Sequence, residues 1–238
     1  MHATLQSEHK IVRAEPPALG PIADTRALHG FPHTARDALG ALRDAGATLV
    51  LERDQELHEQ GTPARYCYQI VSGCLRTVKL MEDGRRQIGD FLMAGDLLGF
   101  DVMDRYAFGA DAVSATVLRR YRVAAVEAMA DHDPGFSRWL RQRAARHLEA
   151  TQAHTLLLGR KSASERIAAF LLEMAHRSPR TTGGTIAVPM CRVDIADHLG
   201  LTIETVCRNL TSLHRAGTIA LTRGTVEICH KAALEHNG

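Results

Sequence analysis

The sequence predicts an α+β fold in which an N-terminal antiparallel β-barrel or β-roll is followed by a long helix and a small helical unit. Between Ala47 and Val126, short apolar runs are separated by glycine corners, a pattern typical of antiparallel barrels and sandwiches. From Asp133 onward the apolar period becomes helical over about 40 Å. Near the C-terminus, a glycine turn lies between two short helical stretches and a hairpin pattern follows.

Composition describes a globular chain with no strong charge bias. Of the 238 residues, 45% are hydrophobic and 24% are charged, with 29 basic against 27 acidic side chains. From Gly159 to the end the count is ten Lys or Arg against seven Asp or Glu, a mild basic lean compatible with nucleic acid. No apolar run is long enough to span a bilayer and the N-terminus lacks a signal-peptide core. We therefore expect a cytoplasmic protein with no membrane partner.

The barrel is expected to begin after residues 1–35, which hold four prolines and no sustained period and are predicted to form a mobile arm. A short helix is expected over residues 36–45. Beyond it, runs such as 66–71 and 88–92 each lead into a glycine corner, as expected for strands joined by tight turns.

A long helix is predicted to start at Asp133-Pro134, because aspartate is a favourable N-cap and proline fits the first helical position. It is expected to run to about Leu158. Small and apolar residues along it recur at steps of three and four, which is coiled-coil spacing. This stripe predicts a seam between two copies of the chain, and so a homodimer. Its members are Leu140, Ala144, Leu148, Thr151, Thr155 and Leu158.

Residues 192–216 have helix-turn-helix spacing, after a helix that begins at a capping box formed by Ser162 and Glu165. Ala196 is small enough for a close helix crossing, Gly200 permits the tight turn, and Thr202 caps the second helix. The buried stripe of that second helix is expected to be Val206, Leu210 and Leu213.

The second helix leaves polar residues facing outward near its N-terminus, the end that enters the major groove in such motifs. Arg208 can donate two hydrogen bonds to guanine, and Glu204 can accept one from cytosine. Strands over 218–221 and 225–228, joined at Arg223-Gly224, predict the wing. The predicted DNA-binding residues are Thr202, Ile203, Glu204, Thr205, Cys207 and Arg208.

These elements predict four segments: the arm (1–35), a barrel domain (36–132), a dimerisation helix (133–160) and a winged helix-turn-helix DNA-binding domain (161–238). Their order resembles the Crp/Fnr superfamily of transcription regulators over residues 39–234. The segment 95–100 (Gly-Asp-Leu-Leu-Gly-Phe) and the segment 204–208 carry the resemblance. The latter is similar to the Glu-x-x-Ser-Arg pattern of the Fnr and FixK branches, with Cys207 in place of serine.

The resemblance implies a barrel like those of cyclic-nucleotide-binding domains, a double-stranded DNA target related to TTGA-N6-TCAA, and RNA polymerase as a partner. It implies no iron–sulfur cluster, because no cysteine precedes Cys67. It also implies no cyclic AMP, because Phe100 follows Gly99 and Ala110-Asp111 aligns with the Arg-Ser that would bind phosphate. The chain is thus similar to the FixK type, whose members activate genes of low-oxygen respiration, denitrification or nitrogen fixation.

Five cysteines form no CxxC pair and no zinc pattern. Cys191 precedes the first helix of the helix-turn-helix, where unpaired amides and the helix dipole favour an anion, and Arg192 adds a cation. We expect its oxidation to place negative charge opposite DNA phosphate and weaken binding. Cys207, beside Arg208, is a rival target, and an inert thiol is the plain alternative.

Particular residues favour or disfavour several alternative functions. A regulator gated by haem, nitric oxide or a metabolite in the barrel is the main alternative. A metal bound by His147 and His154 across a dimer is a weaker one. An enzyme of the cupin type is disfavoured, because His58-Glu59 lacks further histidine neighbours. A scaffold role is disfavoured by the outward Glu204 and Arg208.

Overall fold

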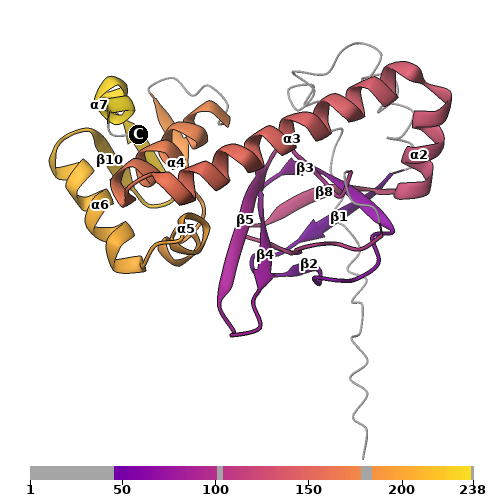
Figure 1. The fold of residues 1–238 in the computed structure, drawn as a ribbon, viewed down its shortest axis with the longest axis horizontal. Helices are drawn as coiled ribbons and strands as arrows, with labels where there is room; N and C mark the ends of the chain where they lie inside the picture. The colour runs from indigo at the N-terminus through magenta and orange to yellow at the C-terminus, as the bar shows by residue number, and fades with distance from the viewer. Residues whose placement is uncertain (1–45, 101–103, 178–183, 237–238) are drawn as a thin grey trace, which may run out of the picture.

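The computed structural model describes residues 46–100, 104–177 and 184–236, so the expected arm and the short helix over 36–45 lie outside the described residues. Figure 1 shows a β-roll, a long helix crossing it, and a helical domain at the far end of that helix. In chain order the elements are β1 (Ala47–Leu51), β2 (Glu56–His58), β3 (Tyr66–Ser72), β4 (Cys74–Leu80), β5 (Arg86–Met93), β6 (Leu97–Leu98), β7 (Gly109–Ala112), β8 (Thr116–Arg122), α2 (Val123–His132), α3 (Pro134–Arg160), α4 (Ala163–Arg177), β9 (Thr185–Ala187), α5 (Arg192–Leu199), α6 (Ile203–Arg215), β10 (Ile219–Thr222), β11 (Thr225–Ile228) and α7 (Lys231–His236).

The roll consists of two four-stranded antiparallel sheets, in the orders β1-β8-β3-β6 and β2-β7-β4-β5. Its interior is lined by apolar side chains, among them Ile70, Leu75 and Leu118, which are fully buried. Cys67 and Cys74 are core residues, and burial raises the pKa of each thiol to about 12. Both therefore behave as small hydrophobic side chains rather than reactive thiols.

The corner between β3 and β4 illustrates why glycine marks the strand ends. Gly73 has a φ of +90°, and a Cβ there would come within 2.4 Å of the carbonyl oxygen of Ala115. The backbone N–H of Cys74 donates to the hydroxyl of Thr116 at 3.1 Å, tying the corner to β8. Only glycine fits both the conformation and the space.

The expected strands reached Val126, but the last strand of the roll ends at Arg122 and α2 starts at Val123. A short apolar run satisfies both a strand and a helix period. The alanines, glutamate and methionine of this run are strong helix formers, and Val126 alone in α2 is buried. Helix propensity therefore decides the outcome.

The long helix begins as predicted. The carboxylate of Asp133 accepts hydrogen bonds from the N–H groups of Gly135 and Phe136 at 2.7 and 3.0 Å, and proline follows the cap. The 27 residues of α3 span about 40 Å. The first turns pack on the roll through Phe136 and Trp139, which contact the cluster of Tyr121.

Two sets of hydrogen bonds stabilise the segment that joins α3 to α4. The predicted capping box forms, because the N–H of Ser162 donates to the Glu165 carboxylate at 2.7 Å and the hydroxyl accepts in return. The guanidinium of Arg166 donates to the carbonyl oxygens of Leu158 and Lys161, and to that of Leu199 at the end of α5. One side chain thus joins the ends of two helices to α4.

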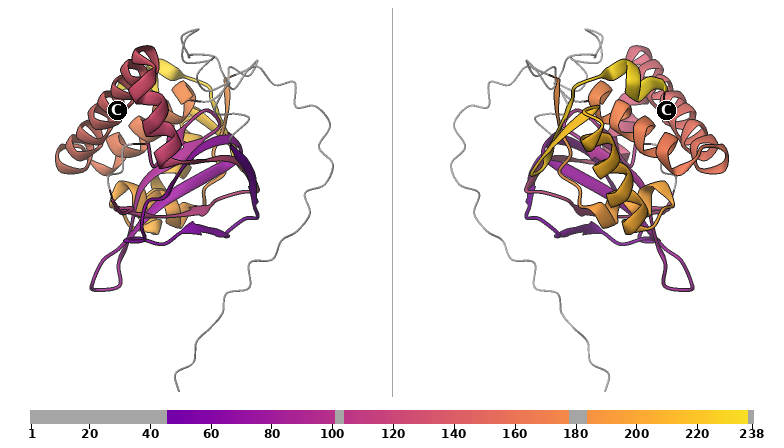
Figure 2. Two further views of the ribbon diagram at one scale, coloured as in Figure 1. Left: turned by 90° about the vertical axis from the view of Figure 1, so that its right-hand side faces the viewer. Right: turned by 90° about the vertical axis from the view of Figure 1, so that its left-hand side faces the viewer.

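The C-terminal domain combines α4, α5 and α6 with a sheet of order β10-β11-β9. The predicted wing hairpin is present as β10 and β11, with Gly224 at the hairpin turn in a conformation of positive φ, and β9 pairs with β11. The two side views in Figure 2 look along the long axis of the molecule, so this domain and the roll overlap in them. Its core is continuous with buried residues of β5, including Ile88 and Phe91. In the described part of the chain, every helix is too short or too polar to cross a membrane.

Candidate nucleic-acid interface

The turn between α5 and α6 has the predicted helix-turn-helix geometry. Gly200 follows α5 with a φ of +61°, and its N–H donates to the carbonyl oxygen of Ala196. Ala196 is buried, so the two helices cross over a small side chain. The hydroxyl of Thr202 accepts a hydrogen bond from the N–H of Thr205 at 3.3 Å and caps α6. These contacts fix the direction in which α6 leaves the turn.

The helix α6 has one buried face and one exposed polar face. The buried face is the predicted stripe of Val206, Leu210 and Leu213. Five of the six predicted DNA-binding residues are exposed, and Thr205 is half-buried. The exposed five are Thr202, Ile203, Glu204, Cys207 and Arg208. The sequence therefore identified the outward face of this helix correctly, while DNA contact by these residues stays a prediction.

Glu204 and Arg208 present opposite charges on successive turns of α6. Hydrogen bonds from its own N–H and from the side chain of Thr202 lower the pKa of Glu204. The carboxylate is therefore ionised at neutral pH and can act as an acceptor for a base amino group. Arg208 reaches the hydroxyl of Thr205 at 3.5 Å, a distance at which little hydrogen-bond strength remains. Most of its donors are thus available to a partner.

The polar face continues past the predicted residues toward the end of α6. Cys207 and Arg208 line a shallow surface hollow together with Thr211, Ser212 and Arg215. The sequence-based prediction did not include these last three residues, because it covered only the N-terminal turns of the helix. They lie three, four and seven positions after Arg208, a spacing that places them on the same face of a helix and could have identified them.

The wing carries one more exposed cation that sequence reasoning did not count as a site residue. Arg223 lies at the turn between β10 and β11 and is exposed. Arginine is among the side chains that most often contact phosphate oxygens in protein–DNA complexes. Arg223 was identified as a turn residue and not as a candidate contact.

Cys191 is the N-cap of α5 and is exposed, as its predicted role requires. From the sequence, the cation Arg192 is the charged residue expected beside the Cys191 thiol. In the structure the thiol forms a side-chain hydrogen bond with Asp194, a carboxylate that is 2% exposed. The neighbour that the fold supplies is thus an anion held inside the interface between the two domains.

The predicted seam of α3 is largely uncovered in the single chain. Ala144, Leu148, Thr151 and Thr155 are exposed, with Leu148 at 57%. The hydroxyl of Thr151 donates to the carbonyl oxygen of His147, and that of Thr155 donates to Thr151. Both threonines therefore satisfy their polar atoms on their own helix and present methyl groups outward. At the two ends, Leu140 and Leu158 are half-buried.

His154 does not face outward from α3 toward a second chain. Its ring stacks on that of His198 of α5, with centroids 4.4 Å apart and an interplanar angle of 21°. This position removes His154 from a metal site shared with His147 across a dimer. Among the described residues, no three histidine, cysteine or acidic side chains gather as metal ligands do.

Charged side chains of the roll bear on the expectation that cyclic AMP is not bound. No arginine or lysine is among the buried side chains of the described residues, whereas an enclosed phosphate needs a cation and clustered donors. From the sequence, Asp111 is expected to occupy a phosphate-binding position and to repel the phosphate. In the structure it forms an ion pair with Arg76 at 2.6 Å. Its neighbours Ala110 and Ala112 are the buried residues of β7. The expected position of the Asp111 side chain is therefore wrong, and the absence of bound cyclic AMP stays a prediction.

Two family matches cover both halves of the chain. Residues 48–133 match the cyclic nucleotide-binding domain family. Residues 165–236 match the Crp-like helix-turn-helix domain family. The whole of α3 lies in the segment between the two matches, so the long helix joins two recognised domains.

Similar proteins of known identity indicate the branch of the family. The nitrogen fixation regulation protein FixK of Azorhizobium caulinodans is 44% identical over 74% of this chain and 72% of its own length. FixK of Bradyrhizobium diazoefficiens is 41% identical over 71% of this chain and 72% of its own. The solved structure of FixK2 from Bradyrhizobium japonicum has a TM-score of 0.77 at 37% identity, covering 81% of this chain and 96% of that one. The chain belongs to the Crp/Fnr superfamily of transcription regulators, in its FixK-type branch.

Proposed function

We propose that this regulator is a cytoplasmic transcription activator that binds, as a homodimer, a two-fold symmetric DNA site related to TTGA-N6-TCAA. The observation that carries the proposal is the exposed pair of Glu204 and Arg208 on the first turns of α6. In the base code of the major groove, arginine pairs with guanine and glutamate with cytosine. Both bases occur in the TTGA half-site and its complement.

The proposed genes are those of low-oxygen respiration, denitrification or nitrogen fixation. The FixK relatives are named as regulators of nitrogen fixation, and a further relative from Rhodopseudomonas palustris, AadR, is named as a transcriptional activatory protein. Activation requires contact with RNA polymerase. The tip of the β4–β5 hairpin, which projects from the roll in Figure 1, carries exposed Glu82 and Asp83 and is the surface that we assign to this contact.

The dimer is supported by the outward face of α3. Leu148 is a large apolar side chain left 57% exposed, and the flanking threonines present methyl groups on the same stripe. A second copy of α3 would cover this stripe by coiled-coil packing. Two recognition helices would then face half-sites about one helical turn, roughly 34 Å, apart.

The regulator is proposed to work without an iron–sulfur cluster and without cyclic AMP. Support comes from the missing N-terminal cysteines and from the lack of a buried cation among the described residues of the roll. An absorbance spectrum of freshly purified protein tests the alternative of a haem-gated regulator. A Soret band would contradict the cofactor-free proposal.

Selection of binding sites from a randomised duplex pool tests the proposed function. The wild-type protein is expected to enrich a two-fold symmetric motif with one guanine per half-site. Glu204→Ala is expected to relax base preference more than it lowers total affinity, because a carboxylate near phosphates is otherwise unfavourable. Failure of the wild type to enrich any symmetric motif would overturn the proposal.

Redox control through Cys191 is the regulatory part of the proposal. The thiol is exposed at the start of α5, and oxidation to a sulfinate or sulfonate adds a fixed negative charge there. After peroxide treatment, wild type is expected to lose DNA binding and Cys191→Ser to keep it. Cys207→Ser is the matched control, since it removes the other exposed thiol of the helix-turn-helix. Equal loss in all three proteins would remove Cys191 as the switch.

A further inference from the structure

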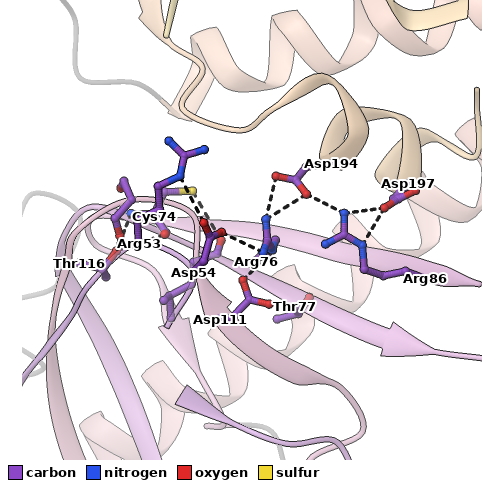
Figure 3. Close-up of polar contacts among 12 residues, drawn as sticks. Arg53, Asp54, Cys74, Arg76, Thr77, Arg86, Asp111, Thr116, Asp194 and Asp197 are labelled. Carbon is purple, nitrogen blue, oxygen red and sulfur yellow. Dashed lines mark hydrogen bonds and ion pairs between the residues drawn. The ribbon is translucent and has the colours of Figure 1, made fainter. Parts of the chain in front are cut away.

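The DNA-binding domain is held on the roll by a group of charged residues that the sequence did not reveal. Figure 3 shows Arg76 and Arg86, on strands β4 and β5, reaching across to Asp194 and Asp197 on α5. We call these four residues the docking cluster. Each arginine comes from the roll and each aspartate from the first helix of the helix-turn-helix.

Asp194 is the centre of the docking cluster. Its two carboxylate oxygens accept hydrogen bonds from one guanidinium nitrogen of Arg76 at 3.0 and 2.9 Å, and one of them accepts from Arg86 at 2.8 Å. The side chain is only 2% exposed. Burial opposes its ionisation, but the hydrogen bond from Cys191 and the two arginines outweigh burial and lower the pKa of Asp194. Asp194 therefore receives three charge-assisted hydrogen bonds from two arginines, at a position largely shielded from solvent.

Both arginines are also fixed by further carboxylates. Arg76 forms ion pairs with Asp111 at 2.6 Å and with Asp54 at 3.3 Å, both on the roll side. Arg86 donates to Asp197 from its Nε at 2.8 Å. Each guanidinium thus has two or more anchors, which restricts its position and, through Asp194, the position of α5.

A second contact holds α4 on the same strand. Arg177, at the end of α4, forms ion pairs with Asp90 at 3.2 Å and with Asp96 at 2.6 Å. The ring of His198 on α5 also packs against Phe91 of β5, with centroids 5.2 Å apart. The domain is therefore fixed to β5 at separate points along its length rather than through a single pivot.

Docking leaves the recognition face free. The residues that meet the roll lie on α4 and α5, whereas the outward residues of α6 remain exposed. An interface that buries one face of a domain and leaves its binding face open does not block DNA. It fixes the angle between α6 and the long helix α3.

We propose that Arg76 and Arg86 are positioning residues for DNA recognition, which set the separation of the two recognition helices in the dimer by holding α5 on the roll. The inference rests on the proposed homodimer. In a two-fold dimer, any rotation of α5 on the roll moves both recognition helices relative to each other. Loss of the docking cluster then widens the range of half-site spacings that the dimer accepts, without changing which bases each half-site prefers.

The test is selection from a pool that holds two fixed half-sites at spacers of about four to eight base pairs. Wild type is expected to enrich one spacing. Arg76→Gln and Arg86→Gln are expected to lower this preference by roughly tenfold. Arg85→Gln is the matched control, because Arg85 precedes Arg86, is 78% exposed in its side chain and pairs with Asp83 within the hairpin. It is expected to behave as wild type.

Folding of the variants is measured by thermal unfolding and sedimentation before the selection. Arg86→Lys is a second variant, because it keeps a positive charge beside Asp194 but loses the forked geometry, and it is expected to widen the spacing range as well. Unchanged spacing preference in folded Arg86→Gln and Arg86→Lys would overturn the inference and leave the proposed function intact. Absence of any spacing preference in wild type would contradict the proposed dimer instead.

Discussion

The two helices of the helix-turn-helix carry the same kinds of charged groups in opposite states. On α5, Asp194 is buried and its oxygens are bound by arginines of the roll. On α6, Glu204 and Arg208 are exposed, and the nearest partner of the arginine is a hydroxyl at 3.5 Å. The difference teaches that charges of the first helix stabilise the arrangement of domains, whereas those of the second retain bonding capacity for an external partner.

Removal of a carboxylate on α5 should produce the largest change in stability. Asp194→Ala removes the carboxylate that two guanidinium groups share while their other ion pairs remain, so we expect a cost of about 1–3 kcal/mol in the free energy of unfolding. Glu204→Ala removes the same charge from an exposed site in the first turn of α6 and should lower stability much less. Chemical denaturation of both variants measures the difference, and equal stabilities would contradict the distinction between the two helices.

Charge placed on the α3 seam should break the dimer. Leu148→Asp would bury an unpaired carboxylate between two helices, so the variant is expected to sediment as a monomer at micromolar concentration. Leu156→Asp is the control, because Leu156 is also exposed, at 66%, but is not part of the predicted stripe. A dimeric Leu148→Asp variant would place the seam elsewhere.

Loss of Arg208 should weaken DNA binding without affecting stability. We expect Arg208→Ala to cost about 1–3 kcal/mol per half-site and to relax preference at one guanine. Arg215→Ala, on the same face of α6, should lower affinity equally for all sequences if its partner is phosphate. Fluorescence anisotropy on matched and mismatched duplexes separates the two effects. If the loss of affinity depends on the duplex sequence equally in both variants, the proposed distinction between a base contact and a phosphate contact is wrong.

Acid should weaken the packing between the domains. Burial lowers the pKa of His198 to about 3, with His154 adding to the effect. A histidine whose pKa is depressed in the folded state stabilises the fold fully above its ordinary pKa, and this contribution is lost as pH falls from about 6.5 toward 3. His198→Gln is expected to reduce the fall in the free energy of unfolding below pH 6. His230→Gln, at an exposed position, is expected to leave this fall unchanged. Parallel pH profiles for the two variants would argue against the buried neutral ring.

The sequence predicted elements whose cause is local. The glycine corners, the Asp133 cap, the capping box at Ser162 and the turn at Gly200 each depend on residues within a few positions of one another. The outward face of α6 followed from a helical period. The α2 boundary was misjudged, because a short apolar run fits both a strand and a helix.

The docking cluster could not be predicted in the same way. Arg76 and Asp194 are 118 positions apart, and nothing in their local sequence distinguishes them from surface charges. The orientation of Asp111 and the stacking of His154 on His198 likewise depend on how separate elements come together. Periodicity identifies which face of an element is buried but not which partner covers it.

A coupling measurement between Arg208 and its guanine tests the reading of bases by α6 most directly. Affinities are measured for wild type and Arg208→Ala on the TTGA-N6-TCAA duplex and on one in which 7-deazaguanine replaces the guanine of each half-site, which removes the N7 acceptor. The modified base is expected to weaken binding of the wild type at least several-fold and to leave binding of Arg208→Ala unchanged. An equal loss of affinity in both proteins would show that Arg208 does not contact this guanine.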